Sequence, residues 1–196
     1  VQRAAVDLAA DAGLVIVDDV DLAMPELGLE WAMANLATLV AELGDRWPAC
    51  RDELTAEIAF GLDVATEVFD LSMAARCEEN RMLAFESMAR VFEQVDLVLC
   101  ATNPDVAFPA EVTVNTRVGD VQVGLENNGA LTIPANICGN PAISVPVGLV
   151  PPHATEPTPA DSTPANSTLA GAGALPVGLQ IIGLHHDDAV LLDLAR

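Results

Sequence analysis

In the first sixty positions the apolar residues mostly follow helical spacing. One short apolar run, between the first and second predicted helices, has the composition of a strand. Residues 1–12 have helix-forming composition, and the β-branched run Leu14–Val17 that follows predicts a short buried strand. From Glu30 to Leu43 the apolar residues recur mostly every three or four positions, and Gly44 is placed to end that helix. Another helix is predicted over Cys50–Phe60. The pattern therefore begins as helix, strand and further helices.

The longest periodic segment runs from Glu67 to Gln94 and predicts an amphipathic helix. Its predicted apolar face consists of Val68, Leu71, Ala75, Met82, Phe85 and Phe92. The helix leads into the apolar run Asp96–Ala101, which predicts an interior strand that ends at the turn signal Asn103-Pro104. Helix followed by strand thus occurs a second time.

The last third of the chain predicts two more strands, over Ala142–Val147 and Val177–Ile182, after a hairpin at Val118–Val121. Between the strands, residues 151–174 are rich in Pro, Thr, Ser, Ala and Gly, which predicts a flexible insertion. Asp187 and Asp188 are placed to cap a final helix. Strands that alternate with helices and are themselves almost continuously apolar predict an α/β fold with a mixed, mostly covered sheet.

Length and hydropathy favour one soluble domain. The 196 residues are 52% hydrophobic, with a mean hydropathy of +0.38, yet no run of about 18 uninterrupted apolar residues occurs. No membrane partner is therefore expected. The opening residues lack the basic and apolar regions of a secretory signal, so the cytoplasm is the expected location.

The strongly negative net charge further limits the kinds of molecule that this protein is expected to bind. Asp and Glu number 29 against 8 basic residues, all of them Arg, so the formal net charge is −21 and the chain contains no Lys. Such a surface repels phosphate backbones and anionic lipids, and nucleic acid is accordingly not expected as a partner. An acidic surface that keeps the protein soluble explains the charge more simply than a specific basic partner does.

Metal and cofactor chemistry is not signalled. The cysteines Cys50, Cys77, Cys100 and Cys138 are far apart in sequence and form no Cys-x-x-Cys pair. His185 and His186 are adjacent, so they point in different directions, and no third ligand is placed to join them. We therefore expect buried free thiols, no metal site and no cofactor.

Three segments, in this order, resemble the C-terminal portion of amidase signature enzymes. They are DLVLCATNPDVAFP at 96–109, IPANICGNPAISVPVG at 133–148 and LPVGLQIIG at 175–183. The second and third are the more specific, because they combine a helix-ending Asn-x-x-Gly with two characteristic strands. The resemblance implies that residues 1–196 are the C-terminal part of an amidase domain with an α/β/α sandwich.

Amidases of this family use a nucleophilic Ser, a second Ser in a cis peptide and a neutral Lys, with an oxyanion hole of backbone amides. This sequence has no Lys, no Gly-Gly and no Ser-Ser dipeptide, so neither the base nor the Gly- and Ser-rich loop can be located. No catalytic residue is assigned, and the chain alone is expected to be inactive. A start at Val1 and a stop inside a predicted helix favour a fragment.

The resemblance also implies where a substrate pocket would open, because α/β sites gather at strand ends. The pocket candidates are Thr102, Asn103, Pro104, Ile137 and Cys138. Ala101 stands where the family often has Pro, which loosens the turn after the strand. The expected function is hydrolysis of a carbon–nitrogen bond in a small non-peptide amide, provided that the catalytic half is present. The alternative is a non-catalytic binding or assembly module, of the kind found in amidotransferases, that forms a homodimer or docks to a separate chain.

Overall fold

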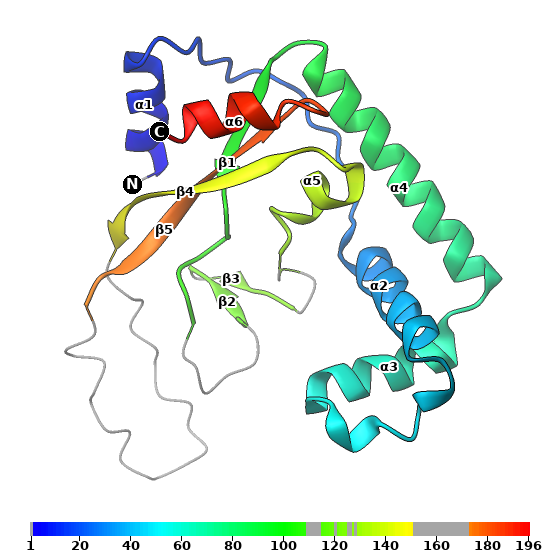
Figure 1. Ribbon diagram of the computed structural model, residues 1–196. Helices are drawn as coiled ribbons and strands as arrows, with labels where there is room; N and C mark the ends of the chain where they lie inside the picture. Colours follow the sequence, from blue (N-terminus) through cyan, green and yellow to red (C-terminus); the bar gives the residue numbers. More distant parts are fainter. Residues whose placement is uncertain (1, 109–114, 120, 125–126, 128, 151–172) are drawn as a thin grey trace.

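The computed structural model describes residues 2–108, 115–119, 121–124, 127, 129–150 and 173–196 (Figure 1). Most of the predicted insertion at 151–174 lies outside these residues. The helices are α1 (Gln2–Asp11), α2 (Gly28–Leu43), α3 (Ala56–Val68), α4 (Leu71–Phe92), α5 (Ile133–Cys138) and α6 (Asp188–Leu194). The strands are β1 (Leu97–Ala101), β2 (Arg117–Val118), β3 (Val121–Gln122), β4 (Ala142–Val150) and β5 (Leu175–Gly183).

The strand predicted at Leu14–Val17 is wrong. This segment has no regular structure, and Val15 is 88% exposed. A β-branched run forms a strand only where a neighbouring strand accepts and donates its backbone hydrogen bonds. The sheets of the described residues give this run no such neighbour.

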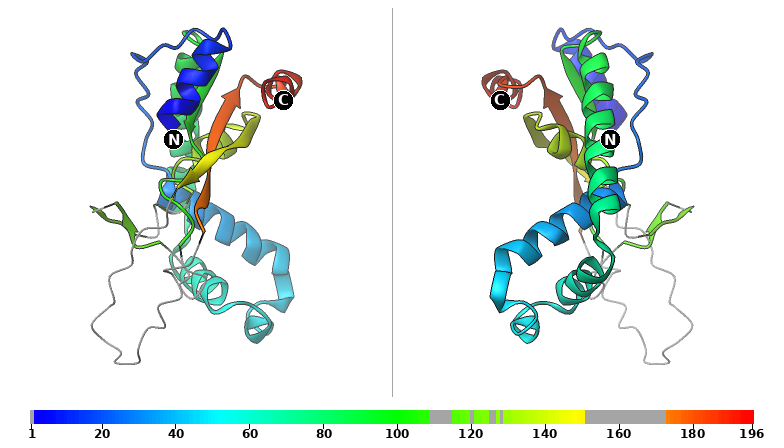
Figure 2. Two further views of the ribbon diagram at one scale, coloured as in Figure 1. Left: turned by 90° about the vertical axis from the view of Figure 1, so that its left-hand side faces the viewer. Right: turned by 90° about the vertical axis from the view of Figure 1, so that its right-hand side faces the viewer.

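Helices α2 and α3 form an arm that extends away from the sheet, as the two further views show (Figure 2). The predicted end of α2 is confirmed, because Gly44 follows the helix with a φ of 52°. Helix α3 begins at Ala56, whereas the sequence predicted a helix over Cys50–Phe60; a short 3-10 turn at Arg51–Glu53 occupies that start. Gly61 lets the two helices approach, since a Cβ there would lie 3.0 Å from the Leu36 side chain.

Helix α4 is shorter than predicted, because the chain breaks at Asp70 between α3 and α4. The Asp70 side chain accepts a hydrogen bond from Met73 N at 2.7 Å and caps the new helix. The predicted apolar face is wrong in its main members: Leu71, Met82 and Phe85 are exposed. The face that α4 buries contains Met73, Ala84, Ser87, Met88 and Val91.

Three strands form the main sheet in the order β1-β5-β4, and both pairings are antiparallel. The α/β class is confirmed. The sheet of the described residues is small, open and wholly antiparallel, whereas the sequence predicted a mixed, mostly covered sheet. The register sets Ala101 opposite Leu179 and Ser144 opposite Gln180, with a bulge in β4 between Pro146 and Gly148. Strands β2 and β3 form the predicted hairpin.

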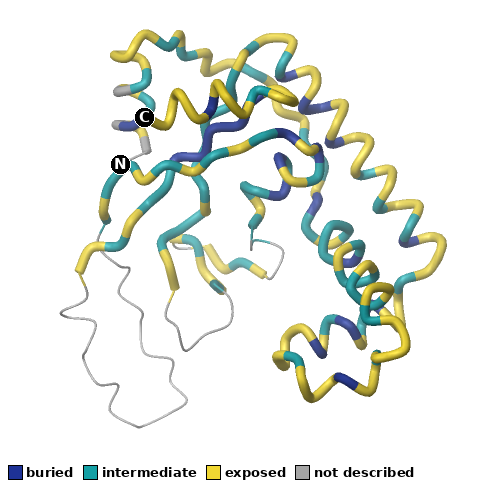
Figure 3. Tube along the Cα trace, in the orientation of Figure 1, coloured by how far each residue is buried: buried dark blue, intermediate teal, exposed yellow. Residues whose placement is uncertain are grey.

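Burial is concentrated along the second half of β5 and where α4 meets α5 (Figure 3). The core cluster at the second place contains Leu27, Ala84, Met88, Ile133 and Cys138. On the sheet, Leu191 of α6 lies against Gly183, where a Cβ would come within 3.3 Å of it. Asp187 precedes α6 but makes no side-chain capping hydrogen bond, so the predicted cap is absent.

Candidate functional site

Thr102, the first of the predicted pocket residues, lies immediately after β1. Its backbone N–H donates to Gly178 O at 3.1 Å, which continues the pairing of β1 with β5 by one residue. Its Oγ1 lies 2.6 Å from Ser144 Oγ of β4, a distance at which one hydroxyl donates to the other. Ser144 is exposed and Thr102 is half-buried, so the pair is open to solvent.

The two hydroxyls meet because the strand between them has no side chain at that point. Strand β5 separates β1 from β4, and a Cβ on Gly178 would lie 2.6 Å from both Thr102 Oγ1 and Ser144 Oγ. Any larger residue at this position would force the hydroxyls apart. The resulting hydroxyl pair, Thr102 and Ser144 above Gly178, is the first candidate site.

Gln180 and Cys100 lie next to the hydroxyl pair on the same face, because the register aligns Ser144, Gln180 and Cys100 across the three strands. Gln180 is 4% exposed, and its Nε2 donates to Leu131 O at 2.9 Å and to Cys100 Sγ at 3.1 Å. Burial raises the pKa of the Cys100 thiol, so this thiol stays protonated at neutral pH. The Gln180 side chain is therefore polar, but its hydrogen bonds to Leu131 and Cys100 hold it in one position.

The turn after β1 carries the other two candidates from this segment. Asn103 is exposed and Pro104 is half-buried. Asp105, the next residue, accepts from Val106 N at 2.7 Å and from Gly119 N at 3.4 Å. The turn is thus tied to the β2–β3 hairpin through Asp105.

Ile137 and Cys138 lie at the end of α5, where Gly139 of the predicted helix-ending Asn-x-x-Gly has a left-handed conformation, with a φ of 73°. The Cys138 carbonyl is 2.8 Å from His185 Nε2, and the His185 ring lies 5.7 Å from the Phe85 ring of α4. Burial raises the pKa of the Cys138 thiol to about 11, an effect that the nearby Arg81 charge partly offsets. Cys138 is therefore a packing residue, inert as a nucleophile at neutral pH.

A groove of about 300 Å³ opens between α2, α4 and α5 and forms the second candidate site. Trp31 and Asn136 meet across it, with Trp31 Nε1 donating to Asn136 Oδ1 at 3.2 Å. At its rim Arg81 donates to both carboxylate oxygens of Glu78, and this pairing lowers the pKa of the Glu78 carboxyl. The lining residues are Glu30, Trp31, Ala34, Asn35, Phe69, Ala74, Cys77, Glu78, Arg81, Asn136 and Ile137.

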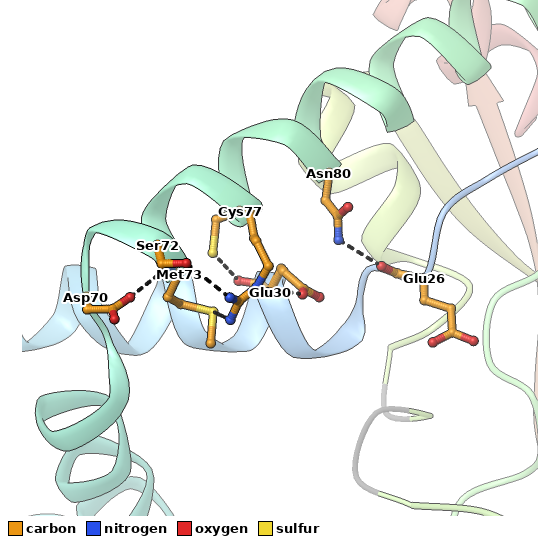
Figure 4. A network of polar contacts seen from close by, with 8 residues as sticks. Glu26, Glu30, Asp70, Ser72, Met73, Cys77 and Asn80 are labelled. Carbon is orange, nitrogen blue, oxygen red and sulfur yellow. Dashed lines mark hydrogen bonds and ion pairs between the residues drawn. The ribbon is translucent and has the colours of Figure 1, made fainter.

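Side chains of α4 fix the position of α2 and of the segment before it (Figure 4). Cys77 Sγ donates to Glu30 O at 3.3 Å, and Asn80 Nδ2 donates to Glu26 O at 3.2 Å. Burial, and then the Glu30 carboxylate, raise the pKa of the Cys77 thiol. The groove wall is therefore held by side-chain-to-backbone bonds from α4 to α2 and to the segment that precedes α2.

The structure divides the predicted pocket residues between two places. Thr102, Asn103 and Pro104 lie at the end of β1, whereas Ile137 and Cys138 lie at the end of α5, and of the five only Ile137 lines the groove. Sequence patterns did not select Ser144, Gly178 or Trp31. The available signal for Ser144 was a serine within an apolar strand, and for Gly178 a glycine within a strand.

The described residues contain neither a candidate metal cluster nor a helix suited to span a membrane. Among them, no group of three or more His, Cys, Asp and Glu side chains is arranged to hold a metal ion. All four cysteines are free. No described helix combines the length and the apolarity that crossing a membrane requires.

Comparison with solved structures defines the fold class. An amidase crystal structure superimposes with a TM-score of 0.72 over 98% of this chain and 39% of that one, at 18% identity. A bacterial aryl acylamidase of the amidase signature family matches with a TM-score of 0.66 over 99% of this chain and 37% of that one, at 20% identity. At these identities the likeness shows the fold.

The Amidase family model matches residues 18–192, so the chain belongs to the amidase family. A glutamyl-tRNA(Gln) amidotransferase subunit from Latilactobacillus sakei is 32% identical over 140 residues, 70% of this chain and 22% of that protein. The corresponding protein of Listeria welshimeri is 26% identical over 145 residues, 74% of this chain and 24% of that protein. The chain thus spans less than two fifths of the length of the relatives it matches.

Proposed function

We propose that residues 1–196 form the C-terminal part of an amidase domain that hydrolyses the carbon–nitrogen bond of small non-peptide amides together with a catalytic part outside these residues. One observation carries this proposal: the family match spans residues 18–192 but only about a quarter of the curated relatives. The sequence also lacks Lys and any Gly-Gly or Ser-Ser dipeptide, the elements of the Ser-cisSer-Lys machinery.

The chemistry that these residues offer agrees with a supporting role. A nucleophilic hydroxyl needs a base as its hydrogen-bond partner, and in the described part of the chain the hydroxyls of Thr102 and Ser144 bond to each other and to no base. The thiols of Cys77, Cys100 and Cys138 have raised pKa values, with burial as the largest cause in each case. The chain therefore supplies pocket walls and substrate contacts, while the nucleophile and base come from elsewhere.

The test is an assay of ammonia release from a panel of small aliphatic and aryl amides. The 196-residue chain alone should release none above background. The same chain joined to its preceding coding sequence should release ammonia, provided that this sequence carries a Lys and a Gly- and Ser-rich loop. Activity of the 196 residues alone, or a preceding sequence without those elements, would overturn the proposal.

An assembly module is the second candidate, favoured by the relatives that are amidotransferase subunits. A free-standing module should be a stable protein by itself. If the purified chain is monomeric, melts cooperatively and remains inactive when joined to its flanking sequence, the assembly role is supported. Pull-down of a defined partner chain would then identify the complex.

A further inference from the structure

Helix α4 lies along an outer edge of the described structure and is apolar on two opposite faces (Figure 1). One face is buried and contains Ala84 and Val91. On the opposite face Leu71 is 90% exposed, and Met82 and Phe85 are each about half exposed. Apolar residues on both sides of a helix are typical of a buried position, yet no described element covers the outer face.

The exposed apolar face has the spacing of a seam between two packed helices. We call it the α4 seam; its members are alternately four and three residues apart and all exposed, namely Leu71, Ala75, Glu78, Met82, Phe85 and Ala89. This spacing keeps side chains on one stripe when a helix packs lengthwise against another. The small side chains of Ala75 and Ala89 allow a second backbone to approach. The α4 seam therefore fits a helix that lies along α4.

A row of glutamates follows one side of the α4 seam. Glu79, Glu86 and Glu93 are seven residues apart and exposed. Glu86 has Arg90 at 3.4 Å, whereas no ion pair is found for Glu79 or Glu93 in the part of the chain that the structure describes. Side chains that flank a helical seam form salt bridges across it and determine which partner binds. The matching helix therefore carries Lys or Arg beside its apolar stripe.

The charge of the seam limits what can cover it. A second copy of this chain does not fit, because each copy has a net charge of −21 and would bring a further row of glutamates. Residues 151–172 do not fit either, since they contain no Lys or Arg and a single large aliphatic residue, Leu169. The chain accounts for less than two fifths of the amidase structures whose fold it shares, so an amidase domain contains enough further chain to supply the helix.

We propose that the α4 seam docks a helix from the part of the amidase domain outside residues 1–196, and that this helix carries Lys or Arg beside an apolar stripe. The inference rests on the proposed function and names the surface to which the other part of the domain binds. Docking covers Met82 and Phe85, and it gives Glu79 and Glu93 the ion pairs that the described residues do not supply.

The experiment compares methionine oxidation by hydroxyl radicals on the two faces of α4, measured by mass spectrometry. It uses the 196-residue chain and a longer chain that includes its flanking coding sequence. In the 196-residue chain Met82 should oxidise roughly tenfold faster than Met88, because their exposed fractions are 51% and 3% and oxidation follows exposure. In the longer chain the two methionines should oxidise equally slowly. An unfolded chain is distinguished from both, since its methionines would oxidise equally fast.

A charge placed in the seam tests whether the seam is covered. Leu71→Asp should leave the urea midpoint of the 196-residue chain unchanged, because the residue is exposed there and the first turn of a helix tolerates an acidic side chain. In the longer chain the same variant should lower the midpoint, since docking would bury the charge. Leu192→Asp, at an exposed apolar residue of α6, is the matched control and should leave Met82 of the longer chain protected.

Reversal of one flanking charge tests the basic partner. Glu79→Lys should raise the oxidation of Met82 in the longer chain at low salt, and added salt should restore the protection by screening the repulsion. Glu42→Lys, which makes the same change at an exposed position of α2, should leave Met82 protected at both salt concentrations.

Two results would overturn the inference. One is a longer chain in which Met88 is protected while Met82 oxidises as fast as in the 196-residue chain. The other is protection of Met82 that appears in the 196-residue chain as its concentration rises, which would assign the seam to a second copy. Ammonia release, measured on the same samples, separates this inference from the proposed function: a protected seam without ammonia supports docking alone, and ammonia release with an oxidised Met82 supports the amidase function alone.

Discussion

Thr102, which directly follows β1, and Ser144 of β4 have hydroxyl oxygens 2.6 Å apart, although strand β5 lies between β1 and β4 in the sheet. The contact depends on the missing side chain of Gly178. Three residues that are distant in sequence thereby define one point on the sheet. Substitutions at this point and at the contacts around it should have measurable effects on stability.

Gly178→Ala should destabilise the fold by about 1–3 kcal/mol, the usual cost of adding a methyl group where no space exists. The added Cβ would lie 2.6 Å from both hydroxyls. Urea unfolding measures the loss. Gly173→Ala is the control, since no atom lies within 4 Å of its Cβ position, and it should leave the midpoint almost unchanged. Adding Thr102→Ala and Ser144→Ala to Gly178→Ala should recover part of the loss.

Asp70→Ala should cost about 1 kcal/mol, because α4 loses the side chain that caps Met73 N. Asp187→Ala is a matched control at the start of α6, where the aspartate makes no capping bond. Thermal unfolding of the two variants should show a lower midpoint for the first alone. Equal midpoints would contradict the assigned cap.

Gln180→Leu should cost about 1–3 kcal/mol, since Leu131 O then loses the side-chain donor that the structure gives it. The two side chains are similar in size, so the effect reports the polar contact rather than a cavity. Gln122→Leu, on the exposed strand β3, is the control and should fall within the small range of surface substitutions. Chemical denaturation of both variants measures the difference.

The free energy of unfolding should fall as pH rises from 9 towards 11. The unfolded Cys138 thiol ionises near its ordinary pKa of 9.0, whereas burial raises the folded pKa to about 11, so the folded state holds its proton longer. The unfolded state therefore binds fewer protons in this window, and stability present below pH 9 is lost through it, by at most about 1.4 kcal/mol per pH unit for one group.

Cys138 can be isolated in this experiment because the chain has no Lys and no Tyr, the other residues that ordinarily titrate there. Cys138→Ala should give a shallower dependence of stability on pH. A slope identical to the parent's would show that the thiol does not carry the effect. Cys77 and Cys100, whose pKa values are also raised, account for the remaining slope.

Strands with strong local signals could be predicted from the sequence. Strands β1, β4 and β5 lie where apolar runs bounded by Pro and Gly predicted them, and Gly139 ends α5 as expected. The run Leu14–Val17 carries a similar local signal but no partner strand, so it is not a strand. Local pattern indicates strand propensity, whereas strand formation depends on a neighbour that is distant in sequence.

Helix α4 shows why the choice of buried face could not be predicted. Its sequence carries two apolar stripes, and the described structure buries the one with Met73, Ala84 and Met88. The predicted stripe, with Leu71 and Phe85, is exposed. Periodicity measures how apolar a face is, but which face is covered depends on α2, α5 and the segment near Leu27.

The candidate site was predicted only in part for the same reason. Thr102 was predicted from its place at a strand end, whereas the sequence around Ser144, Ala-Ile-Ser-Val-Pro, carries no pattern that marks it as a site residue. Its contact with Thr102 follows from the strand order β1-β5-β4, which places β5 between two strands that precede it in sequence. No local pattern contains that information.

The same strand order determines when the sheet can form during synthesis. Strands β1 and β4 emerge first, and among the described strands each pairs only with β5, which the ribosome makes near the end of these 196 residues. Until Leu175–Gly183 leaves the exit tunnel, neither strand has the hydrogen-bonding partner that it pairs with in the described sheet. Nascent chains stalled before residue 175 should therefore depend on chaperones, and the sheet should assemble in a single late step that joins all three strands.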